Sequence, residues 1–235
     1  ALSGELVKYV MSLPQRRYTY RFVYVPETIG SITYLSQGDH LSKLQKSMVA
    51  GFNLSCVGDN RDYSIVESRY MDTLADRVLK NILHYHTDNK YSTYSFLKRG
   101  SDERQYNAPG VDLPVVGFCR SKFGEYPEYH TSADDLSLVS PEGLQGAYDV
   151  MTQVIDALEM NDKYKMKVLC EPQLGKRGLY PTISQKGSYD EIEAMTNFIA
   201  YADGKNDLVD ISNTINVSVR ELTKIIGKLQ SAELI

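Results

Sequence analysis

The alternation of apolar and polar positions divides the chain into predicted strands and helices. Apolar residues recur at helical spacing over residues 2–13, and Pro14 ends this predicted helix. The run YTYRFVYV at residues 18–25 is aromatic or β-branched at nearly every position, which predicts a buried strand of a mostly parallel sheet. Further strands are predicted at residues 51–57, 62–66, 115–119 and 165–171, and further helices at residues 32–35, 41–48, 71–84 and 141–160.

Strands that alternate with helices predict an α/β fold, with a mostly parallel twisted sheet and helices on both faces. The polar residues of 87–113 predict loops, and the glycines of 175–187 predict a linker or an ordered loop. Three predicted helices follow at residues 189–202, 209–215 and 218–229, the last with a capping-box pattern at Ser218 and Glu221. This order is typical of a winged helix-turn-helix, in which Leu234 and Ile235 would start a wing strand. We therefore predict two domains, residues 1–187 and residues 188–235.

Composition adds limits on class and compartment. A chain of 235 residues with 42% hydrophobic residues can form one α/β domain and a small module. The net charge of -4 does not indicate binding to nucleic acid or to an anionic membrane. Cys56, Cys119 and Cys170 are widely spaced and odd in number, which favours buried thiols in a reducing compartment and hence a cytoplasmic protein. No apolar run in the sequence approaches the roughly 20 residues of a membrane span.

Glu27 follows the predicted strand at residues 18–25 almost directly. Ligands of open α/β sheets bind outside the carboxyl ends of strands, so Glu27 is a candidate general base for water. The alternative is a structural role, because a carboxylate at the start of the following helix is stabilised by the helix dipole.

His130 lies in the polar stretch of residues 99–136, after one predicted strand and before a predicted helix. Neutral imidazole is the commonest metal ligand in proteins, and nearby carboxylates can fix its tautomer. His130 is therefore a candidate metal ligand, with a purely structural histidine as the alternative. The other three histidines, His40, His84 and His86, lack such neighbours and are predicted to be surface or packing residues.

Four charged residues of the same stretch have two interpretations each. Asp134 and Asp135 could support a metal ligand or cap a solvated turn. Asp102 and Arg104 could close a surface loop as an ion pair, or they could hold a charged end of a peptide-like substrate.

Several of these runs resemble one family. Residues 126–131 (YPEYHT), with GSD at residues 100–102 upstream, resemble the zinc exopeptidase superfamily of aminopeptidases and glutamate carboxypeptidases. Residues 26–31 (PETIGS) are similar to a Glu-Glu-x-Gly-x-x-Gly-Ser motif of that family, and residues 2–4 (LSG) resemble the end of the motif that provides its bridging metal ligand. The resemblance covers essentially the whole chain and is strongest to an aminopeptidase-like branch with a C-terminal winged helix, encoded among bacterial polysaccharide-biosynthesis proteins.

The resemblance implies a metal-dependent exopeptidase or amidohydrolase, in which zinc activates a water that attacks an amide carbonyl. By position in the motifs, Glu27 would be the general acid/base, Tyr129 would donate a hydrogen bond to the oxyanion, and His130 would be a zinc ligand. The substrate, a peptide or an amide small molecule, would be bound by Ser101, Asp102 and Arg104.

The chain departs from the family at two metal ligands. Thr28 stands where a second carboxylate is expected after Glu27, and Ser55 stands where an Asp is expected. Asp59 is a candidate replacement from the following turn. The family's first motif would begin before residue 1, so we expect this chain to be the C-terminal part of a longer protein. Its site for one or two zinc ions would then be incomplete, and the chain alone would be inactive.

The lost carboxylates favour a second hypothesis, a non-catalytic binding or assembly protein on the same fold, as the transferrin receptor resembles this family without hydrolysing peptides. A third hypothesis is a transcription regulator that binds DNA through the winged helix. Residues 188–235 carry 4 basic and 8 acidic residues, whereas a module that reads DNA presents a basic face. The balance favours a structural role or a protein contact, including a homo-oligomer contact, over nucleic acid.

Overall fold

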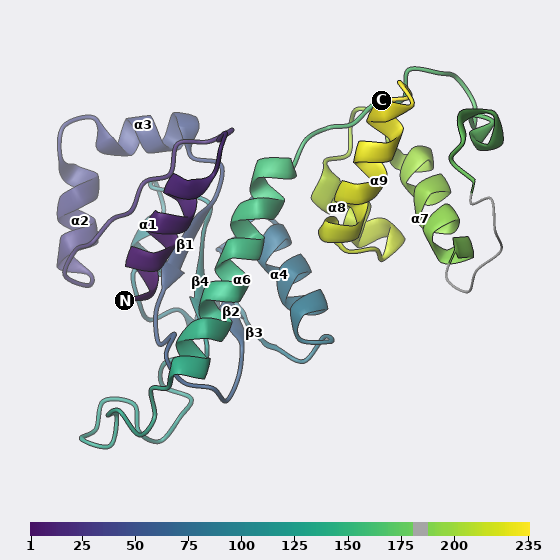
Figure 1. Cartoon of the computed structure of the whole chain (residues 1–235). Coiled ribbons are helices and arrows are strands. Elements are labelled where there is room, and N and C mark those ends of the chain that lie inside the picture. Colours follow the sequence, from purple (N-terminus) through teal and green to yellow (C-terminus); the bar gives the residue numbers. More distant parts are fainter. Residues whose placement is uncertain (181–187) are drawn as a thin grey trace. The chain divides into compact units, whose positions relative to one another are not determined.

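The computed structural model describes residues 1–180 and 188–235. The chain divides into two compact units, residues 1–155 and residues 156–235 (Figure 1). The predicted domain boundary at residues 187 and 188 stays a prediction, since residues 181–187 of the predicted loop lie outside the described residues.

The first unit is built on a sheet whose strands, within the described residues, have the order β1-β4-β2-β3. These strands are β1 (Gly51–Leu54), β2 (Ser64–Val66), β3 (Ser92–Tyr94) and β4 (Val115–Cys119). β4 is parallel to β1 and β2 is parallel to β3, whereas β2 and β4 are antiparallel. The predicted α/β fold with a mostly parallel sheet is confirmed.

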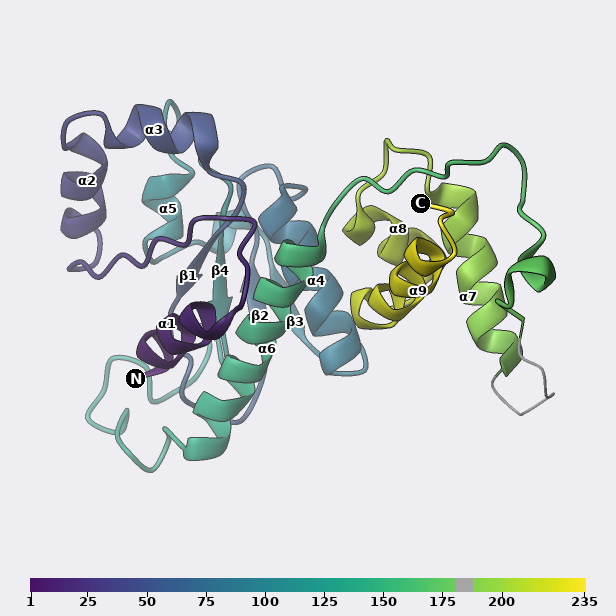
Figure 2. The same cartoon turned by 45° about the horizontal axis from the view of Figure 1, so that its top comes forward.

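Helices cover this sheet. α1 (Leu2–Ser12) and α6 (Pro141–Met160) lie over one face in both views (Figures 1 and 2), and α4 (Leu74–His86) packs against β4. All five residues of β4 are buried, and because successive side chains of a strand point to opposite faces, both faces of β4 are covered. The unit also contains α2 (Ile29–Ser36), α3 (His40–Ser47), the 3-10 helix η1 (Phe96–Lys98) and α5 (Glu103–Tyr106). The last two, with β3, fall in residues 87–113, where the composition predicts loops.

Residues 18–25 do not form the predicted strand. They are an irregular connection between α1 and α2 (Figure 1), in which Val23 and Tyr24 are 38% and 67% exposed. Aromatic and β-branched residues fit a pleated surface, but a strand also needs a neighbour that completes its backbone hydrogen bonds. None of the strands in the described part of the chain pairs with this segment, so the local pattern alone was misleading.

The predicted strand at residues 165–171 is also wrong. Lys165 forms a single bridge with Asp203, and the Lys167 N–H donates to the Leu234 carbonyl at 2.8 Å. Cys170 has a φ of 63°, a left-handed conformation that ends an extended segment, and its side chain is exposed instead of buried. The predicted wing at residues 234 and 235 is therefore a backbone contact and not a strand.

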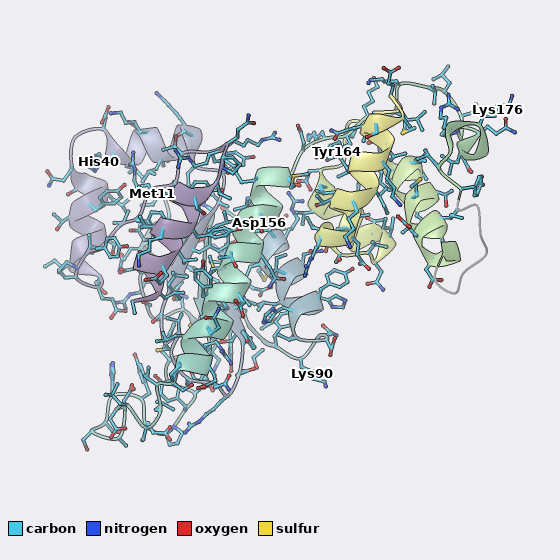
Figure 3. All side chains as sticks on the ribbon, in the orientation of Figure 1. Met11, His40, Lys90, Asp156, Tyr164 and Lys176 are labelled. Carbon is cyan, nitrogen blue, oxygen red and sulfur yellow. The ribbon has the colours of Figure 1, made fainter. Side chains whose placement is uncertain are left out.

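The second unit contains α7 (Ser188–Tyr201), α8 (Leu208–Ile215) and α9 (Val219–Ser231), preceded by the 3-10 helix η2 (Leu174–Arg177). The predicted capping box of Ser218 and Glu221 begins α9, which confirms the helix-turn-helix. Tyr164, labelled in Figure 3, contacts Phe198 with ring centroids 5.9 Å apart. The buried apolar core draws on all three helices: Met195, Phe198, Leu208, Ile211, Leu222 and Ile225. Across residues 1–180 and 188–235, every helix is too short or too polar to cross a bilayer.

Candidate active site

A tight turn presents Glu27 at the start of α2. Thr28 has φ 64° and ψ -71°, and the Ile29 N–H donates to the Glu27 carbonyl at 2.8 Å. These values describe a γ-turn of the rare form with positive φ. A β-branched residue is strained in this region, at a cost of about 1–3 kcal/mol. The Glu27 side chain itself is exposed, so it is available to a ligand.

Asp102 and Arg104 contact this turn. The Thr28 N–H donates to Asp102 Oδ1 at 2.7 Å, and the Ser31 hydroxyl lies 2.9 Å from the same oxygen. The Arg104 guanidinium donates to Thr28 Oγ1. Ser101, which precedes them, is buried. Both charged residues thus face the segment that carries Glu27, while their predicted contact with a substrate stays a prediction.

Tyr129 and His130 form the other side of the candidate site. Their rings stack with centroids 3.9 Å apart and planes inclined by 17°. His130 is exposed and has a φ of 59°, whereas Tyr129 is half-buried and packs edge-on against Tyr126 at 5.6 Å. The imidazole therefore lies on the surface, and Tyr129 connects it to the aromatic interior of the loop.

Electrostatics link Tyr129 to Glu27. The pKa of Tyr129 is raised from its ordinary value of 10.0, first by burial and then by electrostatic interaction with Cys56 and Glu27. Glu27 thus contributes to the raised pKa of Tyr129 although the two residues are far apart in the sequence. A phenol with a raised pKa stays protonated at neutral pH, so Tyr129 can act as a hydrogen-bond donor.

Cys56 and Tyr126 belong to the same cluster, although the sequence did not mark them as site residues. The Tyr126 hydroxyl lies 3.4 Å from Cys56 Sγ and 3.4 Å from Asp134 Oδ2, so it can donate a hydrogen bond to either atom. Burial raises the pKa of Tyr126, with further contributions from Cys56 and Asp134. The available signal was the place of Cys56 just beyond β1, at the carboxyl end of a strand.

Asp59 and Asp135 are engaged elsewhere. Asp59 is buried and accepts hydrogen bonds from the Ser121 hydroxyl at 2.7 Å and the Ser121 N–H at 2.9 Å. Asp135 accepts from the Ser137 N–H at 2.7 Å within a turn. The Ser137 hydroxyl and then its N–H lower the pKa of the Asp135 carboxyl. Neither contact brings these carboxylates to His130.

The described residues do not make a zinc site by themselves. No group of three or more His, Cys, Asp or Glu side chains in residues 1–180 and 188–235 is arranged to hold a metal ion. A zinc site needs at least three protein ligands. His130 could therefore be one ligand, but the other ligands are not found in the described part of this chain.

Known proteins match both parts of the chain. Residues 162–235 match a winged helix-turn-helix family. A Clostridium acetobutylicum protein, provisionally named a polysaccharide biosynthesis protein with aminopeptidase-like domain, is 37% identical over 229 residues. The match covers 96% of this chain and 51% of that protein, so the chain spans about half the length of this relative.

Solved structures with similarity to this chain were also found. A crystal structure of a Clostridium acetobutylicum protein, provisionally named a peptidase, is 35% identical with a TM-score of 0.86, over 99% of this chain and 51% of that one. An aminopeptidase from Aneurinibacillus sp. strain AM-1 is 19% identical with a TM-score of 0.43, over 54% of this chain and 29% of that one. Residues 1–161 match the family described as a domain of unknown function, DUF4910, and the chain belongs to this family.

Proposed function

We propose that the first unit forms one wall of the active site of an aminopeptidase-like amide hydrolase, which acts on a peptide or an amide small molecule. The observation that carries this proposal is the stacking of the exposed His130 imidazole on the Tyr129 ring, with centroids 3.9 Å apart. The contribution of Glu27 to the raised pKa of Tyr129 supports it. The aminopeptidase-like domain in the name of the Clostridium relative supports the same reaction class.

Each of these residues has a role that suits its position. The exposed Glu27 carboxylate would take a proton from the attacking water and return it to the leaving amine. The protonated Tyr129 hydroxyl would donate a hydrogen bond to the oxyanion that forms on the carbonyl. His130 would be one zinc ligand, and the remaining ligands would come from outside the described residues. Zinc, when bound, polarises the carbonyl.

A second candidate function is a non-catalytic binding or assembly protein. Thr28 supports it, because the side chain at this position interacts with Arg104 and its backbone interacts with Asp102, so the expected ligand position serves the turn instead. The winged helix would then make the protein contact. DNA is a weaker candidate partner, since Lys228 of α9 is paired with Glu191 and acidic residues outnumber basic ones in residues 188–235.

The test uses the protein in its full-length form. Zinc content and hydrolysis of aminoacyl p-nitroanilides are measured for the wild type, for Glu27→Gln and for the control Glu142→Gln, which alters an exposed carboxylate in the first turn of α6. We expect zinc in all three proteins and a loss of about 100-fold or more in kcat for Glu27→Gln alone. Equal activity of Glu27→Gln and wild type would remove Glu27 from the mechanism. Absence of both zinc and hydrolysis at saturating zinc would favour the binding function.

A further inference from the structure

The γ-turn at Thr28 is a strained element placed next to the proposed general base. Its φ of 64° is sparsely populated by any residue with a side chain, and a threonine would relax to an extended or helical conformation if it were free. Strain of this kind persists only where the surroundings hold the backbone in place. The direction of the Glu27 side chain therefore depends on whatever holds Thr28.

We propose that Asp102 is a positioning residue, which together with Arg104 holds this turn and so sets the direction of the Glu27 carboxylate. The buried Glu103 carboxylate connects the backbone before Asp102 to the sheet through hydrogen bonds. The role of Asp102 differs from a substrate contact, and its catalytic consequence rests on the proposed function of Glu27.

The γ-turn is held by contacts to the backbone and to the side chain of Thr28. Asp102 Oδ1 accepts the Thr28 N–H at 2.7 Å, a charge-assisted hydrogen bond, and Arg104 donates to the Thr28 side chain. The buried Ser31 hydroxyl lies 2.9 Å from the same Asp102 oxygen and 2.8 Å from the Thr28 carbonyl. The Asp102 carboxylate thus contacts both the γ-turn at Thr28 and Ser31 in the first turn of α2.

The position of Asp102 is in turn fixed by its neighbour. Glu103 is fully buried, and its Oε1 accepts the Gly100 N–H at 2.8 Å and the Ser101 N–H at 3.1 Å. Its Oε2 accepts from Asn53 Nδ2, in β1, at 2.9 Å. The backbone just before Asp102 is therefore tied to the sheet through a single carboxylate.

A second tie reaches the central strand. Asn107 Nδ2 donates to the Glu103 carbonyl at 2.8 Å and to the Val115 carbonyl, in β4, at 2.7 Å. β1 and β4 are parallel neighbours in the sheet. Both strands thus fix α5, the short helix that begins directly after Asp102. The position of the turn at Thr28 therefore depends on the sheet.

The two roles for Asp102 predict different kinetics. Loss of a substrate contact raises KM, whereas misplacement of a general base lowers kcat and changes KM little. The substitutions are Asp102→Asn, which keeps the shape of the side chain, and Asp102→Ala, each alone and with Thr28→Gly. Glycine adopts positive φ without strain, so Thr28→Gly should keep the γ-turn even when the contacts from Asp102 are lost. Asp39→Asn, at an exposed carboxylate before α3, is the control.

Two measurements decide the proposal. In the 235-residue chain, hydrogen exchange at the Thr28 and Ile29 amides should become about tenfold faster in Asp102→Ala and Asp102→Asn but not in Asp39→Asn. In the full-length protein, kcat should fall by about 10- to 100-fold with KM within about twofold, and Thr28→Gly should restore part of kcat. Circular dichroism checks that each variant is folded.

The outcomes separate this proposal from the proposed function. Unchanged exchange at Thr28 and Ile29 would overturn the hold on the turn, and a raised KM with unchanged kcat would overturn positioning in favour of substrate binding. A full-length protein without hydrolase activity would refute the proposed function alone. In that case faster exchange in Asp102→Ala, with no change in Asp39→Asn, would still support the role of Asp102 in holding the turn.

Discussion

Tyr129 and His130 are neighbours in the chain, yet their rings stack face to face at 3.9 Å. Successive side chains of an extended segment point to opposite sides, so this stacking depends on the left-handed conformation of His130, with φ 59°. The turn leaves the imidazole exposed while it keeps the phenol half-buried. One backbone conformation thereby places an exposed imidazole directly against a half-buried phenol.

The electrostatic link across the candidate site can be measured at Tyr129. A negative charge disfavours the tyrosinate, so removal of the Glu27 charge in Glu27→Gln should lower the pKa of Tyr129 toward 10.0. Burial, the larger cause, should remain and keep part of the shift. The measurement is a pH titration by NMR of the protein with 13C-labelled tyrosine. Glu142→Gln should leave the titration unchanged, and an unchanged Tyr129 pKa in Glu27→Gln would show that the two residues do not interact.

Some elements could be predicted at their observed bounds because local sequence determines them. β4 is apolar at every position, as expected for a strand covered on both faces. α6 begins at Pro141, as predicted, and the Ser140 hydroxyl accepts the Gly143 N–H at 3.0 Å, which is a typical N-cap contact. In contrast, residues 18–25 have a strand-like composition but no pairing strand in the described chain, and composition carries no information about a partner.

The site was predictable only in part for a similar reason. Short motifs indicate Glu27, Tyr129 and His130 as candidates, and their roles stay predictions. The contact between Thr28 and Asp102 joins residues that are 74 positions apart, and it depends on a backbone conformation that no local pattern indicates for threonine. Cys56 was missed since a cysteine beyond a strand fits a packing role equally well.

Gly30 should not tolerate a side chain. A Cβ atom there would lie 2.7 Å from the Val25 Cβ and 2.8 Å from the Pro26 Cδ, both on the segment that leads into the turn. Gly30→Ala should therefore lower the free energy of unfolding by about 1–3 kcal/mol, measured by urea denaturation. Gly4→Ala is the matched control, because nothing lies within 4 Å of its Cβ on the exposed side of α1. That change should raise stability by about 0.5–1 kcal/mol, and equal effects of the two would contradict the close packing at Gly30.

Arg120 should be essential for stability of the first unit. Arg120 is 2% exposed, and its guanidinium donates to the Asp62 carbonyl at 2.6 Å, the Gly143 carbonyl at 2.9 Å and Asn60 Oδ1 at 2.9 Å. Arg120→Met would fill a similar volume but leave three acceptors without their donors. We expect a loss of about 3 kcal/mol or more in the free energy of unfolding, measured by chemical denaturation. Arg220→Met, at an exposed position of α9, should change stability by less than about 0.5 kcal/mol.

Tyr106 should make the protein sensitive to alkaline pH. Burial raises the pKa of Tyr106 from 10.0 to about 12, because its ring packs against the cluster of Leu35, Leu113 and Val115. A folded-state pKa above the unfolded value contributes stability that is complete below pH 10 and is lost as the pH rises through about 12. The free energy of unfolding should therefore fall across this range, as measured by urea denaturation at stepped pH. Tyr106→Phe keeps the ring and removes the ionisable hydroxyl, so its stability should fall less steeply over the same range. Identical slopes for the two proteins would assign the alkaline transition to other groups.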